Sequence, residues 1–175
     1  TGSNYFGVMH YATPGTSNFT NSRFTPGFTD KITGLMGNLF VKYNGLEWFT
    51  TLESLSGRSR FESTGSRNAS QIATDLVYRF GKNENFWVGA KYNRANSQMY
   101  LANDLPAVDA SGNLPAFEAS QKGMYDINID RLAFSAGWFL TKNVMTKVEY
   151  VNQTYNGFKY NHINSDGKFN GLVVQ

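Results

Sequence analysis

The 175-residue chain has no cysteine, four prolines and two histidines, and none of its apolar runs is long. Without cysteine there is no disulfide framework and no thiol chemistry. No apolar run approaches the roughly 18 residues of a spanning helix, which excludes helical membrane insertion. The net charge is only +3, and no Lys/Arg cluster of the kind that binds nucleic acid is present. These absences exclude disulfide and thiol chemistry, helical membrane spans and nucleic-acid binding.

The two histidines, His10 and His162, give little support to catalysis. Neither has the local spacing of a metal site, and the sequence has no GxSxG, HExxH or P-loop motif. We therefore expect no enzymatic activity, no cofactor and no bound metal. The alternative is a catalytic site at a barrel rim that pairs His10 with a loop carboxylate.

Aromatic residues and glycine are abundant, with 14 Phe, 10 Tyr and 17 Gly. They lie in segments of about ten residues in which apolar and polar side chains alternate, the pattern of a β-strand with one apolar face. The four prolines fall between these segments, as an uninterrupted strand ladder requires. We expect eight segments, at residues 5–11, 32–43, 46–55, 72–80, 86–94, 125–140, 144–155 and 168–175.

Short and long connections alternate along the chain. Tight turns are expected at Asn44-Gly45, 81–85 and 141–143, and long loops at 12–30, 56–69, 95–123 and 155–167. This asymmetry is typical of an up-and-down barrel in an outer membrane, where one side has short turns and the other long loops. Most segments also exceed the five or six residues of an average soluble strand. We expect the long loops to lie together and loop 95–123 to carry any recognition.

Segment 125–140 changes phase. Tyr125, Ile127 and Ile129 alternate out of step with Leu132 and the apolar residues that follow. Two interpretations fit: a β-bulge near Asp130-Arg131, or a strand that extends beyond the bilayer.

The alternation places the charged side chains of the strands on one face. We assign this face to the lumen, because each Lys or Arg at mid-bilayer depth on the lipid side costs roughly 2–4 kcal/mol. Their nearly balanced signs favour a paired network or a weakly selective aqueous lumen. The predicted lumen-facing residues are Lys42, Glu47, Glu53, Asp75, Arg79, Lys91, Arg131, Lys147 and Glu149. The predicted lipid-facing residues are Leu39, Val41, Leu76, Tyr78, Val88, Leu132, Phe134 and Val148. A predicted aromatic girdle at the membrane interface consists of Tyr43, Trp48, Phe80, Phe86 and Trp138.

The C-terminal residues VMTKVEYVNQ (144–153) and GKFNGLVVQ (167–175) resemble the closing hairpin of Gram-negative outer-membrane porin-like β-barrels. The resemblance implies an antiparallel up-and-down transmembrane β-barrel in the cell outer membrane. It would form a passive pore or the barrel subunit of an envelope assembly. Its expected partners are outer-membrane lipid, lipopolysaccharide and other outer-membrane proteins. In such barrels the last strand usually ends in an aromatic residue, whereas this sequence ends at Gln175.

We expect one β-barrel domain over residues 1–175, with about eight strands, forming the C-terminal portion of a longer chain. Eight strands that closed alone would need a lumen filled by side chains. Phe40, Phe49 and Trp87 offer bulk, but Gly89, Ser135 and Gly137 would leave gaps, which favours a wider barrel.

Two alternatives remain open. One is a small closed eight-stranded structural or adhesive barrel with partner-binding loops, and the other is a soluble lipocalin-like ligand-binding barrel. The lipocalin-like fold would invert the faces and point Ile72, Leu76 and Phe80 inward.

Overall fold

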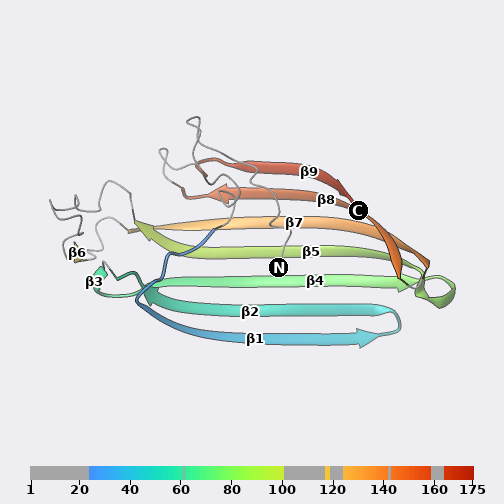
Figure 1. The fold of residues 1–175 in the computed structure, drawn as a ribbon, viewed down its shortest axis with the longest axis horizontal. Helices are drawn as coiled ribbons and strands as arrows, with labels where there is room; N and C mark the ends of the chain where they lie inside the picture. The colour runs from blue at the N-terminus through green and yellow to red at the C-terminus, as the bar shows by residue number, and fades with distance from the viewer. Residues whose placement is uncertain (1–23, 61, 101–116, 119–123, 142, 159–163) are drawn as a thin grey trace.

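The computed structural model describes residues 24–60, 62–100, 117–118, 124–141, 143–158 and 164–175. Within them, seven strands form one antiparallel sheet in the order β1-β2-β4-β5-β7-β8-β9 (Figure 1). The strands of this sheet are β1 Lys31–Tyr43, β2 Leu46–Arg58, β4 Arg67–Phe80, β5 Phe86–Tyr100, β7 Met124–Thr141, β8 Val144–Asn156 and β9 Lys168–Val174. The predicted all-β antiparallel meander is confirmed for these residues. No helix in the described part of the chain is long and apolar enough to cross a membrane.

The tight turns lie at one end of the sheet, and the longer connections leave from the other (Figure 1). Asn44 and Gly45 both have positive φ, at 45° and 80°, which are the two left-handed positions of a type I′ hairpin turn. The β4–β5 turn contains the short 3-10 helix η2 (Lys82–Glu84), preceded by Gly81 at φ 85°. The predicted sorting of connections by length therefore appears in the topology.

Several strands are longer than the alternation predicted. β2 ends at Arg58 and β4 begins at Arg67, so the predicted loop at 56–69 is wrong at both ends. β5 continues to Tyr100, so residues 95–100 are strand and not loop. These extensions carry mostly polar and small residues, which is why they read as loop, yet the ladder pairing continues through them.

Of the two interpretations of the phase change, the β-bulge near Asp130-Arg131 is wrong. β7 pairs with β5 in unbroken register from Met124 to Trp138, so it is a single strand of 18 residues. The change of phase has another cause. Ile127 and Ile129 are buried on the same face as the charged residues further along the strand, in a cluster with Tyr155 and Phe158. At this end of β7, protein covers the face that carries the charged residues further along the strand. The apolar residues therefore lie on that face here, which changes the phase of the pattern.

The main sheet contains seven strands, where about eight were predicted. The expected first segment, residues 5–11, lies outside the described residues. Two short strands that the alternation did not predict, β3 (Glu62–Thr64) and β6 (Phe117–Glu118), pair in parallel within the long connections. β1 and β9 are the edges of the sheet, and within the described residues no pairing joins them.

Candidate functional site on the charged face of the sheet

The ladder register sorts the side chains into two faces. Opposed residues share a face, so the register connects each strand's apolar stripe to that of the next strand. We call this side the apolar face. It carries all eight predicted lipid-facing residues, each exposed: Leu39, Val41, Leu76, Tyr78, Val88, Leu132, Phe134 and Val148.

The opposite side, the charged face, carries all nine predicted lumen-facing residues: Lys42, Glu47, Glu53, Asp75, Arg79, Lys91, Arg131, Lys147 and Glu149. On the strands inside the sheet, most side chains on this face are more occluded than their neighbours on the apolar face. On β7, Ala133 is buried and Ser135 half-buried, whereas Leu132 and Phe134 are exposed. A sheet that curves toward its charged face produces this difference, because side chains on a concave side converge.

Near the tight turns, one carboxylate forms ion pairs with two cationic side chains. Glu47 Oε1 accepts hydrogen bonds from Lys42 Nζ at 2.9 Å and from Arg79 Nε at 3.1 Å. The three side chains come from three adjacent strands, with Glu47 on the middle one. The Arg79 guanidinium also lies 5.7 Å from the centre of the Phe139 ring. Ion pairing therefore reaches across three neighbouring strands.

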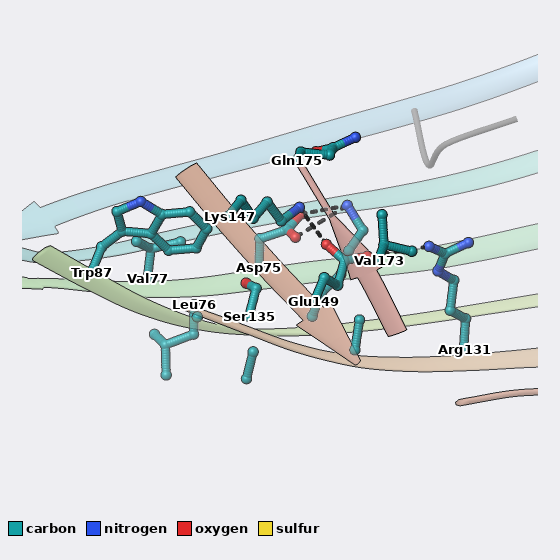
Figure 2. Close-up of a pocket in the computed structure, with 14 residues that line it drawn as sticks. Asp75, Leu76, Val77, Trp87, Arg131, Ser135, Lys147, Glu149, Val173 and Gln175 are labelled. Atoms are coloured by element: carbon teal, nitrogen blue, oxygen red, sulfur yellow. Dashed lines mark hydrogen bonds and ion pairs between the residues drawn. The ribbon is translucent and has the colours of Figure 1, made fainter. Parts of the chain in front are cut away.

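A second group of charges lies over β7 and β8 (Figure 2). Glu149 is paired with Arg131 Nη2 at 3.4 Å and with Lys147 Nζ. On β4 and β5, Asp75 and Lys91 are directly opposed and their charged atoms lie 3.1 Å apart. All five side chains are at least two-thirds buried. Mutual pairing offsets part of the desolvation that this burial costs.

These charges surround a hollow of about 330 Å³ on the charged face (Figure 2). Lys91, Arg131 and Lys147 oppose Asp75 and Glu149 in its lining, a balance of three positive to two negative charges. Gly89 and Ser135 also line it, as the sequence-based argument about gaps predicted. The hollow can accept a small polar solute or water.

Trp87 forms one wall of this hollow and is only 9% exposed. Its indole lies directly over Gly137, the residue opposite it on β7, so the gap predicted at Gly137 is filled. The Trp87 Nε1 atom is buried without a hydrogen-bond partner among the described residues. The fit of a large ring over a glycine in the neighbouring strand fixes the indole in place.

Polar groups within the apolar face are bonded to one another. Trp48 Nε1 donates to Thr74 Oγ1 at 2.9 Å, and the Thr74 and Thr50 hydroxyls are 2.8 Å apart. Nearer the turns, the rings of Tyr78, Phe80, Phe86 and Trp138 stack in sequence, with neighbouring centroids 5.6–6.1 Å apart. Trp48, predicted to belong to the girdle with Tyr43, lies further from the turns than Tyr43 and is level with Val41.

The boundary of the apolar face is oblique to the strands. Along each strand, from the tight turns toward the long connections, this face changes from apolar to polar residues. The last apolar residue is Leu35 on β1 and Leu172 on β9. Directly opposed residues connect Leu172 across the sheet to Val41 on β1, through Tyr150, Phe134, Ala90, Leu76 and Trp48. The boundary thus moves from position 35 to position 41, six residues over six strand-to-strand steps. One residue of about 3.4 Å per strand spacing of about 4.8 Å corresponds to an inclination of about 35°.

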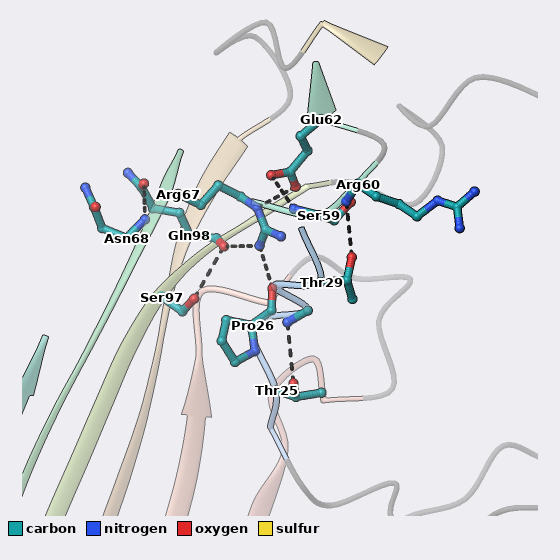
Figure 3. Close-up of polar contacts among 11 residues, drawn as sticks. Thr25, Pro26, Thr29, Ser59, Arg60, Glu62, Arg67, Asn68, Ser97 and Gln98 are labelled. Atoms are coloured by element: carbon teal, nitrogen blue, oxygen red, sulfur yellow. Dashed lines mark hydrogen bonds and ion pairs between the residues drawn. The ribbon is translucent and has the colours of Figure 1, made fainter. Parts of the chain in front are cut away.

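Sequence patterns did not find the buried ion pair at the end of the sheet where the long connections leave (Figure 3). Arg67 and Glu62 are each about 5% exposed, and Arg67 Nε donates to Glu62 Oε1 at 2.8 Å. Arg67 Nη1 also donates to the carbonyls of Pro26 and Gln98, at 2.8 and 2.9 Å. No local periodicity marks these residues: Glu62, five residues before Arg67, lies outside the alternating segments, and the Pro26 and Gln98 carbonyls are distant in sequence.

His10 and His162, and nearly all of the expected recognition loop beyond Tyr100, lie outside the described residues. Within the described part of the chain, no group of three or more His, Cys, Asp or Glu side chains could hold a metal ion. Comparisons with protein-family models, curated proteins and solved structures found no match for the chain.

Proposed function

We propose that this sheet is part of the wall of an outer-membrane β-barrel. Its apolar face contacts lipid and lipopolysaccharide, and its charged face lines an aqueous passage. The barrel then acts as a porin-like passive pore for small polar solutes, or as the barrel subunit of an envelope assembly with other outer-membrane proteins. No catalytic step and no cofactor are part of the proposal.

The oblique boundary of the apolar face carries this proposal. Strands in outer-membrane barrels tilt by about 35–45° from the membrane normal, so a flat membrane surface must cross them at that inclination. The boundary from Leu35 to Leu172 is inclined by about 35°. A soluble sheet packed against another layer has no reason to shift its apolar stripe steadily in one direction, by an average of one residue per strand.

The charged face supports the same proposal. Three of its carboxylates, Glu47, Asp75 and Glu149, are paired with Lys or Arg on the same or adjacent strands, and Asp75 and Glu149 line a hollow together with polar groups. A lipocalin-like barrel would need apolar residues such as Leu76 and Phe80 on the occluded side, where this sheet has its charges. The two signs are nearly balanced, which favours weak ion selectivity.

Spin labels on single cysteines test this proposal, since the chain has no cysteine of its own. Phe134→Cys and Ser135→Cys are matched neighbours on opposite faces of β7. In lipid vesicles, we expect a lipid-soluble relaxation agent such as oxygen to reach the label at position 134. A water-soluble agent should reach the label at position 135. Equal accessibility at the two positions would contradict the face assignment.

The oblique boundary gives a second test. Leu35 on β1 and Asn156 on β8 are connected across the sheet by directly opposed residues: Ser54, Ser70, Asn96 and Asn128. We expect a label at Leu35→Cys to contact lipid and a label at Asn156→Cys to contact water. If both labels were equally exposed to water, the tilted-membrane arrangement would be wrong.

A further inference from the structure

Residues 24–30 cross the charged face at the end where the long connections leave. In Figure 1 this segment, the bluest part of the described chain, runs obliquely over the sheet toward the start of β1. At one end, Phe24 packs against the cluster of Ile127, Ile129 and Tyr155 on β7 and β8. At the other end, Thr29 N and Asp30 N both donate to the Arg58 carbonyl of β2 at 3.1 Å. We call residues 24–30 the strap.

The middle of the strap is attached to the sheet by Arg67 of β4 (Figure 3). The Arg67 side chain donates to the Pro26 carbonyl, and its guanidinium lies 5.1 Å from the centre of the Phe28 ring. Glu62 holds the guanidinium in place and also accepts from Ser59 N at 3.0 Å. The strap is thus fixed by a buried, charge-assisted contact at its centre.

Phe28 also depends on the sheet beneath it. A Cβ added at Gly57 of β2 would lie 2.7 Å from the Phe28 ring, so only glycine allows this approach. Beyond Phe28, the Arg58 guanidinium binds Asp30 Oδ2 at 2.7 Å, and Arg60 N donates to Thr29 Oγ1 at 3.1 Å. The strap is therefore attached to the sheet or its connections near its start, its middle and its end.

We propose that the strap is the specificity-determining element of the passage, restricting by size the solutes that reach the hollow at Lys91 and Lys147. This rests on the proposed function, because the strap restricts passage only if the charged face lines a lumen. The physical basis is its position: it spans from β8 to β1 over the charged face, on the long-connection side of the charged pairs. Thr25 and Gly27 are exposed on it and so are available to a passing solute.

The experiment compares solute-size cut-off, by vesicle swelling with neutral sugars of increasing size, in the wild type and two strap variants. Phe24→Ala removes the anchor on β7 and β8, and Arg67→Gln removes the central attachment. Phe40→Ala is the matched control, an exposed aromatic residue on the charged face that lies away from the strap. We expect both strap variants to admit larger sugars than the wild type and the control. An unchanged cut-off in folded Phe24→Ala protein would overturn the inference and leave the proposed function intact.

A modification experiment does not depend on the stability of the Arg67 variant. Thr25→Cys places one thiol on the strap, and Leu39→Cys places one on the apolar face as the control. Labelling with a bulky water-soluble thiol reagent should lower single-channel conductance in the Thr25→Cys protein and leave the Leu39→Cys protein unchanged. Equal conductance before and after complete labelling at position 25 would overturn the inference. If the inserted wild-type protein passes no solute, both the proposed function and this inference are wrong.

Discussion

Two glycines of the sheet have opposite surroundings, although sequence pattern alone treats them alike. Gly137 on β7 lies under the Trp87 indole, and any side chain there would overlap the ring. Apart from its two neighbours in the chain, Gly37 on β1 has no residue with a heavy atom within 4 Å of the position a Cβ would take. At the first site the glycine allows the packing of Trp87, while at the second it has no steric role.

Gly137→Ala is therefore expected to lower the free energy of unfolding by about 1–3 kcal/mol, the usual cost of overpacking. Gly37→Ala, the matched control, should change it by less than about 0.5 kcal/mol. Urea unfolding of the protein folded in lipid vesicles measures both. Equal effects of the two substitutions would contradict the placement of Trp87 on Gly137.

Thr74 is the second residue with a defined contribution to stability. Its hydroxyl binds both the Trp48 indole N–H and the Thr50 hydroxyl on the apolar face. Within the proposed function this face lies in lipid, where neither partner has water as an alternative, so Thr74→Val should cost about 1–3 kcal/mol by leaving a donor unsatisfied. Thr146→Val is the control, because the Thr146 hydroxyl makes only a long 3.4 Å bond to the Trp138 carbonyl. Indistinguishable unfolding curves for the two variants would show that the Thr74 bonds are not formed in the membrane.

At the scale of elements, strand pairing determines which stripe each residue joins. A shift of one residue between β2 and β4 would move every β4 side chain to the opposite face. The observed register places Glu47 opposite Val77 and Phe49 opposite Asp75. This register brings Arg79 within reach of Glu47, so the ion pair and the pairing support each other.

The β2–β4 register can be tested by disulfide formation, because Ser54 and Ser70 are directly opposed and both exposed. Opposed residues in a ladder have Cα atoms about 4.5–5.5 Å apart, within the range of a disulfide. We expect Ser54→Cys/Ser70→Cys to cross-link on mild oxidation. Ser54→Cys/Asn68→Cys, shifted by two residues, should not. Electrophoresis of an internally cleaved chain detects the bond, and preferential cross-linking of the shifted pair would contradict the register.

At the scale of the whole molecule, the number of strands in the sheet restricts how a barrel can close. In an antiparallel meander of seven strands, β1 and β9 run in the same direction. Direct pairing of these edges would be parallel, which an up-and-down barrel does not contain. Copies of the sheet in the same membrane orientation would also meet in parallel. Within the proposed function, an antiparallel closure therefore requires an odd number of further strands.

The long β1 edge fits this requirement. Every residue of β1 is exposed, including Met36 and Phe40 on the charged face. An uncovered edge strand of this length is prone to pair with another chain. A neighbouring strand would satisfy its free backbone groups and cover part of its apolar surface.

The sequence by itself determined the class of fold, the sides of the strands and the positions of the tight turns. Strand alternation has a period of two, so Leu76 and Val77 fall on opposite faces whatever the rest of the chain does. Asn44-Gly45 likewise specifies its own turn, through two adjacent residues that accept positive φ. These features depend on neighbouring residues only, which is why the apolar and charged faces could be predicted residue by residue.

Only the tertiary structure decided which charges pair, where the strands end and what crosses the sheet. Arg67 meets Glu62 and Pro26, and Phe24 meets Ile127, through contacts whose partners are not marked by any local pattern. A bulge remained one interpretation of the phase change in β7 because the pattern could not reveal that Phe24 of the strap packs against Ile127 and Ile129. The inclination of the apolar boundary also needs the register of six strand pairs. Most of these features depend on residues distant in sequence, which only folding brings together.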